Sequence, residues 1–553
     1  MLFKFGSTIV SISSIFLGLH ASLTNAAVPF NPKHVSLQAL QQEFSVVIPG
    51  QWQQAAIIPA PINSLKYIGV HKDAHQMNHF RLQQQYAGYD VFGGYVIVHG
   101  KVLNSGTTLA VDNSTSMTGL VYDSLEADLG APAPSFEQQA ENALQSFLSQ
   151  FEGESISQAT ATPIVYIDES NQAHWAYKVS AFIQYIDKIP ARPTAILDAQ
   201  TFNEFIQWNA LQTNSNLTSL TPVRGQGYGG NTKTDVVQYN GAQFPFLEIS
   251  RNDTTQVCYM SNNGVRVIDM QHKFSTVTNS SMKFNCPDPT SLLQQDYYWT
   301  GYLGDGYDRE NGGFSPSNDA LYFGYVINHL YHDWYNENAL SQPDGTPMKL
   351  VMRVHYGDGY ENAFWDGMSM TFGDGADFFY PLVSLGVGAH EISHGFTEQH
   401  SNLIYYGESG GMNEAFSDMA AQAAEYYSTK TNTWMIGSEI VKEDSGYTAL
   451  RFMDLPSKDG ASIDTAEEYY EGLDVHYSSG VYNHLFYLLA HQKGWDTRKA
   501  FDVMIKANMD YWTPYSSFQE GACGILSATQ DLGYTVSTVE DVLYAVKLDA
   551  QDC

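Results

Sequence analysis

The sequence predicts an α+β protein in which regions of different character follow one another. Over residues 28–208, strand-like segments surround one amphipathic helix, a pattern typical of a small mixed domain. A stretch rich in Asn, Ser, Thr and Gly follows from Asn209 to Thr234, and it indicates a linker and a candidate site of proteolytic processing. Beyond it the chain is dense in Gly, Tyr and Phe and rich in strand signals up to about Tyr380, and from Leu382 onward the apolar residues recur at helical spacing.

The first region carries clear local signals. Residues 80–100 predict two strands around a glycine-containing turn. Residues 135–151 place apolar side chains at helical spacing, with Ser135 and Gln138 as a capping-box start. Two further strand pairs are expected up to Trp208. Since this region contains no catalytic constellation, it is interpreted as a folding or inhibitory module.

In the C-terminal part, two long amphipathic runs predict helices, over Met412 to Tyr427 and over Gly480 to His491. No internal repeat interrupts the pattern.

Composition limits the possible partners. The 553 residues include 27 basic and 59 acidic side chains, which gives a formal net charge of −32, and 43% of the residues are hydrophobic. This apolar fraction is enough to bury a sizeable core. Nucleic acid and anionic membranes need a basic surface, so the charge argues against both as main partners.

The first 26 residues are typical of a signal peptide. Lys4 precedes an apolar stretch, and Thr24-Asn25-Ala26 supplies small residues at the positions that a signal peptidase inspects. Ser, Gly and His interrupt the apolar stretch, which argues against the alternative of a membrane anchor. No later stretch has the ~20 apolar residues that a membrane span requires. We therefore expect secretion, with cleavage after Ala26 or, alternatively, after Ala27.

Four cysteines, Cys258, Cys286, Cys523 and Cys553, remain in the exported chain. An even count in such a chain indicates disulfides, and four cysteines allow three pairings. Their positions favour two local loops, Cys258–Cys286 and Cys523–Cys553. A structural zinc site is the alternative, but no Cys-x-x-Cys spacing supports it.

The motif H-E-I-S-H carries most of the chemical information. On a helix, His390 and His394 share one face and can bind one metal ion, while Glu391 can reach water on that metal. Glu414, twenty residues later, can supply a third ligand, and Asp418, one helical turn beyond, can accept the free ring N–H of a ligating histidine. Two histidines, one carboxylate and an open position predict a catalytic zinc site.

These motifs, H-E-I-S-H and then G-G-M-N-E-A-F-S-D, resemble those of the thermolysin-like zinc metallopeptidases, most closely their secreted pseudolysin/vibriolysin-type branch. Q-Q-Q-Y-A-G-Y-D-V-F-G-G-Y-V-I-V-H resembles the fungalysin/thermolysin-type propeptide segment. The block around 135–208 resembles the PepSY-type inhibitory module, and the cysteine pairs sit where this branch has its disulfides. The resemblance covers nearly the whole chain.

The resemblance implies a two-lobed catalytic domain preceded by an α+β propeptide. Its N-terminal lobe is β-rich, its C-terminal lobe is helical, and the zinc helix lies between them. The expected division is a signal peptide at 1–26, a propeptide at 27–210, the N-terminal lobe with the zinc helix at 211–400 and the helical lobe at 401–553, with no further domain after Cys553. The implied protein is a secreted zinc endopeptidase whose propeptide assists its folding and inhibits it. We expect polypeptide substrates, a monomer, no nucleic acid and no membrane span.

The resemblance also assigns roles position by position. It implies zinc ligation by His390, His394 and Glu414, and general base catalysis by Glu391. The further residues that it implies are Tyr405 and His476 for the oxyanion, Asp474 to orient His476, Asn362 and Ala363 for the substrate backbone, and Arg451 for the substrate carbonyl. Leu382, Val387 and Leu450 match the pocket beyond the scissile bond, which implies cleavage before bulky apolar residues, although ordinary core packing is a fair alternative for them.

Calcium is the point at which the sequence departs from the family. The positions that match its calcium ligands are Gly386, Gln422, Glu425 and Thr433, of which one is a carboxylate. Calcium prefers six to eight oxygen ligands, several of them charged, so we expect this site to be weak or lost.

Two other functions compete with the peptidase. One is a catalytically silent binding or adhesive protein that keeps a zinc fold, against which the presence of Glu391, Tyr405 and His476 argues. The other is a zinc hydrolase of small amides or lipids, against which the long Gly- and Tyr-rich approach to the site argues.

Overall fold

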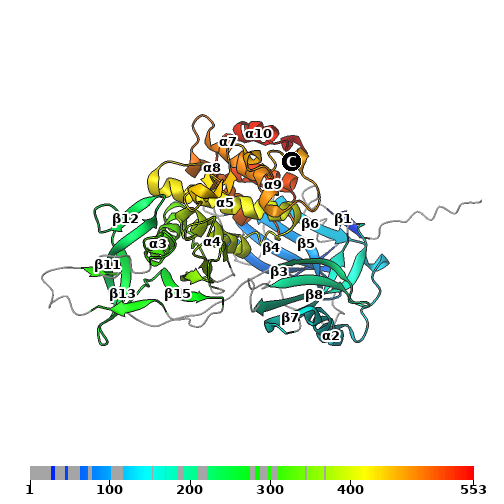
Figure 1. Cartoon of the computed structure of the whole chain (residues 1–553). Coiled ribbons are helices and arrows are strands. Elements are labelled where there is room, and N and C mark those ends of the chain that lie inside the picture. The colour runs from blue at the N-terminus through cyan, green and yellow to red at the C-terminus, as the bar shows by residue number, and fades with distance from the viewer. Residues whose placement is uncertain are drawn as a thin grey trace, which may run out of the picture.

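The structure is a computed structural model that describes residues 27–30, 44–47, 63–72, 77–100, 116–151, 153–168, 170–184, 192–209, 221–274, 281–286, 297–300, 309–342, 345–365 and 369–553. The predicted signal peptide, residues 1–26, lies outside this part of the chain. Figure 1 shows the strands of the N-terminal region, blue to teal, on one side and the green strands of the later region on the other, with the yellow-to-red helices above both.

The N-terminal region, up to Asn209, is built on one continuous sheet with the order β10-β9-β8-β7-β5-β4-β3-β2, and β6 pairs with both β5 and β1. A parallel contact between Val91 and Val165 joins its two halves. The strands are β1 (Val28–Phe30), β2 (Ser45–Val47), β3 (Asn63–Lys72), β4 (Asn78–Tyr86), β5 (Tyr89–Gly100), β6 (Ser116–Asp123), β7 (Ser155–Ile167), β8 (Ala173–Gln184), β9 (Pro193–Asp198) and β10 (Glu204–Asn209).

The predicted strand pairs and helix of this region are confirmed. Strands β4 and β5 flank the turn at Ala87-Gly88, and α2 (Phe136–Leu148) packs Ala143, Leu144 and Phe147 against the sheet. The capping box is wrong, since Ser135 makes no side-chain cap hydrogen bond. Helix α2 is therefore held by burial of its apolar face rather than by its cap.

The second region, from Thr221, begins with strands and ends with helices. Its sheets have the orders β12-β11-β13-β14-β16, with β17 also on β11, and β15-β18-β20-β19, beside a short β21-β22 pair. The strands are β11 (Thr221–Asn231), β12 (Asp235–Tyr239), β13 (Leu247–Asn252), β14 (Val257–Tyr259), β15 (Val265–Lys273), β16 (Lys283–Asn285), β17 (Tyr297–Trp299), β18 (Leu350–Tyr356), β19 (Ala363–Trp365), β20 (Met370–Phe372), β21 (Met435–Ile436) and β22 (Arg451–Phe452).

The helices of this region surround one continuous apolar core. They are α3 (Pro316–Tyr335), α4 (Leu385–Gln399), α5 (Gly407–Thr429), α6 (Val475–Ser478), α7 (Gly480–Ala490), α8 (Thr497–Asp510), α9 (Phe518–Asp531) and α10 (Val536–Ala545). Ser384 caps α4 by accepting a hydrogen bond from Val387 N at 3.2 Å. Residues 409–424 of α5 are all buried, so this helix lies inside the core rather than on its surface.

The segment up to Tyr380 is rich in strands, as predicted, but it also contains the twenty-residue helix α3, which the sequence did not predict. One expectation for this region is wrong. The predicted linker from Asn209 to Thr234 does not continue to Thr234, because residues 221–231 form β11, which pairs with β12, β13 and β17.

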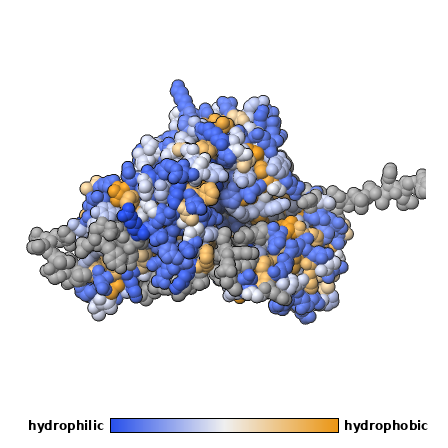
Figure 2. Space-filling view, viewed as in Figure 1, coloured by the Kyte–Doolittle hydropathy of each residue, from blue (hydrophilic) through white to orange (hydrophobic). Residues whose placement is uncertain are grey.

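Both expected disulfides are present, Cys258–Cys286 and Cys523–Cys553. The second ties the C-terminus to α9. Among the helices of the described residues, none is long and apolar enough to cross a bilayer. On the face shown in Figure 2, hydrophilic side chains predominate and apolar ones are scattered.

Candidate active site

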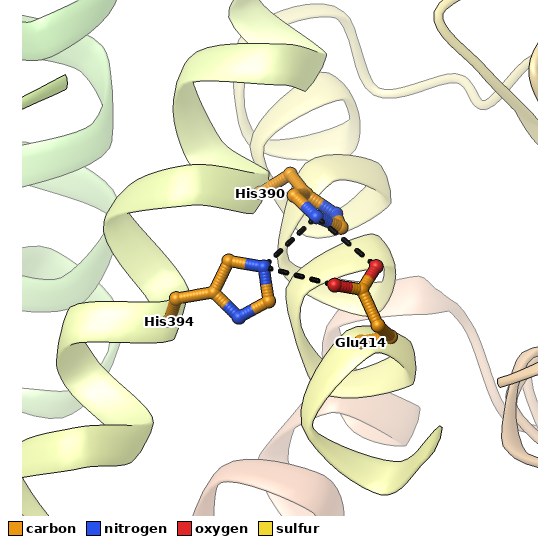
Figure 3. A group of neighbouring side chains, drawn as sticks. All are labelled: His390, His394 and Glu414. Atoms are coloured by element: carbon orange, nitrogen blue, oxygen red, sulfur yellow. Dashed lines mark hydrogen bonds and ion pairs between the residues drawn. The ribbon is translucent and has the colours of Figure 1, made fainter. Parts of the chain in front are cut away.

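Two helices bring three potential metal ligands together. His390 and His394 project from successive turns of α4, and their Nε2 atoms lie 3.1 Å apart. Glu414 projects from α5, with Oε2 3.4 Å from His390 Nε2 and Oε1 3.3 Å from His394 Nε2. Figure 3 shows the three side chains pointing toward one another from the two helices. In the described part of the chain, this is the one group of its kind whose ligand atoms all lie within 4.8 Å of one another.

The second nitrogen of each imidazole is held by a hydrogen bond. His390 Nδ1 lies 2.8 Å from Asp418 Oδ1, and His394 Nδ1 lies 2.7 Å from Asn413 Oδ1. An acceptor at Nδ1 leaves the Nε2 lone pair of a neutral imidazole free for a metal ion. Asp418 occupies the place that the sequence predicted for it. Asn413 was missed, although it directly precedes Glu414.

Asp418 is the centre of a buried charge network. Its carboxylate accepts two hydrogen bonds from Arg451, both at 2.7 Å, and one from Asn483 Nδ2 at 2.8 Å. Arg451, which the sequence analysis assigned to the substrate carbonyl, lies with its guanidinium against Asp418 and has one nitrogen 3.7 Å from Glu414 Oε2. No local pattern predicts this pairing, because β22 and α5 meet only in the tertiary structure.

The charges of this network keep both acids ionised. Although burial alone would raise it, the pKa of Glu414 is held well below its usual value by His476, His390 and His394. Burial likewise opposes ionisation of Asp418, but the guanidinium of Arg451 holds the pKa of that carboxyl well below its usual range. The site therefore presents a permanent negative charge to a cation.

Glu391 lies between the ligands and the edge of a sheet. Its Oε2 accepts a hydrogen bond from the backbone N–H of Trp365 at 2.9 Å. Trp365 ends β19, which is the last strand in the order of its sheet. Asn362 and Ala363 lie at the start of this strand, where Asn362 is exposed and its Oδ1 accepts from Ala363 N at 2.9 Å. Sequence reasoning missed Trp365.

On the other side of Glu414 lies a tyrosine–histidine pair. The hydroxyl of Tyr405 donates to Glu414 Oε1 and lies 3.2 Å from His476 Nε2. His476 Nδ1 lies 2.7 Å from Asp474 Oδ1, which also caps α6 by accepting from His476 N at 2.9 Å. Burial, followed by the charge of Glu414, raises the pKa of Tyr405 well above its usual value, so it stays a hydrogen-bond donor.

The donor set fits zinc. Two imidazole nitrogens and one carboxylate converge, Asp418 and Asn413 fix the imidazole tautomers, and the buried Glu414 Oε2 has no hydrogen-bond donor among the described residues. Such three-ligand sites leave one coordination position open for water or substrate. The fold and the site together assign the protein to the class of zinc-dependent hydrolases.

The family follows from comparison with known proteins. Residues 232–398 match the catalytic domain of the thermolysin metallopeptidases, residues 401–548 match their alpha-helical domain, and residues 63–105 match the fungalysin/thermolysin propeptide motif. The zinc metalloproteinase of Legionella pneumophila is 54% identical over 541 residues, which cover 98% of this chain and 97% of that protein.

Two further relatives agree. The zinc metalloproteinase MspA of Legionella longbeachae is 53% identical over 542 residues, 98% of each chain. The neutral protease of Vibrio proteolyticus is 42% identical over 475 residues, 85% of this chain and 71% of that one. The chain belongs to the thermolysin family of zinc metallopeptidases. It is a zinc-dependent metalloendopeptidase with a propeptide motif, and the predicted fold class and cofactor are confirmed.

The four positions that match the family's calcium ligands do not fit calcium. Gly386 has no side chain. The amide of Gln422 donates a hydrogen bond to Met435 O and accepts one from Trp434 N. The carboxylate of Glu425 accepts hydrogen bonds from Thr433 N and Thr433 Oγ1 at 3.0–3.1 Å. One carboxylate, which also binds Thr433, is fewer than the several charged oxygen ligands that calcium prefers.

Proposed function

We propose that the chain is exported, loses its N-terminal region by cleavage, and in its mature form cuts internal peptide bonds before bulky apolar residues. The position of Glu391, within hydrogen-bond distance of β19 and beside the three ligands, carries this proposal. An extended polypeptide can pair with an edge strand such as β19. A scissile bond held there would lie next to a general base.

Each polar group of the site has a proposed role in hydrolysis. When bound by His390, His394 and Glu414, zinc supplies a Lewis acid that polarises a carbonyl and lowers the pKa of a water molecule. Glu391 takes the proton of the attacking water and passes it to the leaving amine. Tyr405 and His476 donate hydrogen bonds to the negative charge that develops on the carbonyl oxygen.

Four residues position these groups and the substrate. Asp474 accepts a hydrogen bond from the ring of His476 and favours its protonated form. Asn362 and Ala363 bind the substrate backbone at the start of β19. Arg451 keeps its proposed contact with the substrate carbonyl, and its two hydrogen bonds to Asp418 hold the guanidinium in one orientation.

Specificity is assigned to three apolar residues. Leu382 and Val387 are buried in the core, whereas Leu450 is 38% exposed and is available to a substrate side chain. We expect a peptide library to show cleavage before Leu, Phe or similar residues. A preference for charged residues at that position would overturn the assignment.

The processing site is proposed to lie between β10 and β11. Cleavage beyond Thr221 would shorten β11, which is the central partner of β12, β13 and β17. The signal peptide at 1–26, the propeptide at 27–210, the two lobes divided near residue 400, and a monomeric mature enzyme complete the proposal. N-terminal sequencing of the secreted protein tests it: a start between Ala210 and Thr221 supports it, and a start near Val28 contradicts it.

One experiment tests the mechanism. Casein is digested by the wild-type protein and by Glu391→Ala, each with and without a zinc chelator. We expect loss of a general base to reduce the rate by at least about 10²-fold to 10⁴-fold and the chelator to abolish the wild-type activity. Digestion that persists in Glu391→Ala would show that another group takes the proton.

A further inference from the structure

The N-terminal region contacts the catalytic region at a surface formed by the segment Met509–Tyr515, which comprises the end of α8 and the residues that follow it. The guanidinium of Arg81 on β4 donates a hydrogen bond to Met509 O. The ring of His99 on β5 stacks on Tyr511 at a centroid distance of 4.8 Å, and the ring of Phe92 meets Tyr515 edge-on at 5.0 Å. We call this surface the docking contact.

A pair of histidines is buried at the docking contact. His79 on β4 and His99 on β5 are directly opposite each other in the sheet, and their side chains are 0% and 2% exposed. Their Nδ1 atoms lie 2.7 Å apart. A hydrogen bond between two ring nitrogens needs one N–H and one lone pair. A proton on both Nδ1 atoms would place two N–H groups face to face, so the pair fits the docked state only while one ring is neutral.

The charges around the pair admit one proton and oppose a second. His79 Nε2 lies 3.6 Å from Asp510 Oδ2 at the end of α8, which favours one positive charge. Lys506 already binds the same Asp510 oxygen at 2.9 Å, and also Asp531 on α9 at 3.2 Å. Within the described part of the chain, the charges near the pair are those of Lys506 and Arg81 on β4 and of the carboxylate of Asp510, which Lys506 shares. His99 also contacts the ring of Tyr511 and Thr118 Oγ1, which lies 3.0 Å from His99 Nε2.

Electrostatics agree with this geometry. Burial lowers the pKa of His99 to about 3, and the charges of His79, Arg81 and Lys506 add to the effect against the opposing influence of Asp510. A histidine in water has a pKa of about 6.5. Undocking removes the ring of Tyr511 and the charge of Lys506 from His99 and exposes its imidazole to water, so the undocked state binds the proton more tightly. Docking is therefore fully stable above about pH 6.5 and weakens as the pH falls from there toward about 3.

We propose that the docking contact is a proton-sensitive surface: mild acid places a second proton on the His79–His99 pair and releases the N-terminal region from the catalytic region. The inference rests on the proposed role of residues 27–210 as a removable propeptide. It adds a condition under which this propeptide leaves. If one histidine must lose its proton for the two regions to dock, the dissociation constant of the contact is about 30-fold higher at about pH 5 than at neutral pH.

Binding, rather than activity, is the readout that tests the proposal. The precursor carries Glu391→Ala, which blocks self-cleavage, and a recognition sequence for a specific protease is inserted between β10 and β11. After cleavage of that site, the dissociation constant of the two-part complex is measured by sedimentation at about pH 7.5 and about pH 5. We expect the constant to rise about 30-fold between these conditions.

Matched variants assign the effect to the histidine pair. His79→Gln combined with His99→Gln keeps hydrogen-bonding groups but cannot take up the second proton, so its dissociation constant should change less than about threefold. His99→Gln alone serves as a second test where the double variant does not fold. His174→Gln is the control, since His174 pairs with Asp168 at 2.8 Å inside the N-terminal region and should leave the 30-fold change intact.

Two results would overturn the proposal: a parent complex that binds equally well at both pH values, or glutamine variants that weaken in acid as much as the parent. Neither would affect the proposed peptidase activity, because every protein in the experiment is inactive. Conversely, failure of the casein digestion would leave the measured binding unchanged.

Discussion

The N-terminal region and the catalytic region bury their apolar side chains in different ways. The catalytic region has one large core that runs from its strands through α4 and α5 to α10, with one small separate cluster between β15 and β18. The N-terminal region has separate small clusters, of which one lies under α2 and another between β3, β4, β5 and β6. Small separate cores give less stability and less cooperativity than one large core. If the N-terminal region is removed as proposed, small cores suffice for it, whereas the catalytic region gains lasting stability from one large core.

The largest expected effect tests this division directly. Phe147 is 1% exposed in the cluster under α2, and Phe147→Ala should cost about 3–5 kcal/mol of the stability of the N-terminal region. In calorimetry of the Glu391→Ala precursor, we expect this change to lower one of two unfolding transitions. The matched change Phe501→Ala, in the catalytic core, should lower the other. A single transition that moves with both variants would show that the two regions unfold as one unit.

The second prediction concerns the catalytic region alone. Tyr405→Phe removes a donor to the developing oxyanion and should lower kcat by about 10²-fold to 10³-fold, with a smaller change in KM. Steady-state kinetics on a peptide checks this. Tyr406→Phe is the neighbouring control, since Tyr406 is 46% exposed and has no proposed role. Equal effects of both changes would point to a loss of local structure instead.

The third prediction concerns the pH dependence of stability, which one buried carboxyl group of the zinc helix should change. Burial raises the pKa of Glu398 on α4 to about 7, against the opposing effects of Trp365, Arg192 and His394. The folded protein therefore favours the protonated form of Glu398. This form costs no stability below about pH 4.5, and the protein loses stability as the pH rises from there through about 7. The difference in free energy of unfolding between Glu398→Gln and the parent should be larger at about pH 8 than at about pH 4.5, by on the order of 2 kcal/mol in favour of the variant. Parallel Tm profiles of variant and parent across this range would contradict it.

The smallest expected effect is that of calcium. Because hydrogen bonds from Thr433 already occupy the carboxylate of Glu425, millimolar calcium should leave Tm of the catalytic region unchanged. A bound ion would raise Tm in proportion to the logarithm of its concentration, so the titration distinguishes the two cases. A rise of that form would mean that other oxygen atoms complete a site.

Local patterns were sufficient where function and structure depend on residues close in sequence. The spacing of His390 and His394 on one helix predicted their convergence, and the strand pairs of the N-terminal region followed from alternation and turn residues. Helix α3 was missed because Tyr, Phe, Val and Ile favour strands, and its burial against β15 and β18 outweighs that preference. The partners Asn413 and Trp365, the Asp418–Arg451 pair and the docking contact arise from tertiary packing.

Strand β11 was predicted to be part of a linker for a different reason. Its glycines are typical of a linker, but they serve close packing against α3. A Cβ atom on Gly229 would lie 2.0 Å from Asp319 Oδ1, whose carboxylate also accepts hydrogen bonds from Gly230 N at 2.8 Å and from Tyr239 OH at 2.6 Å. Only glycine leaves room for this carboxylate, so a composition typical of flexibility marks a rigid position.

The docking contact also limits when it can form during synthesis. Arg81 and Met509 are 428 positions apart in the chain. A ribosome has therefore made nearly the whole protein before Arg81 can contact Met509. Through this surface the N-terminal region can act on a completed chain but cannot guide the early steps of its folding.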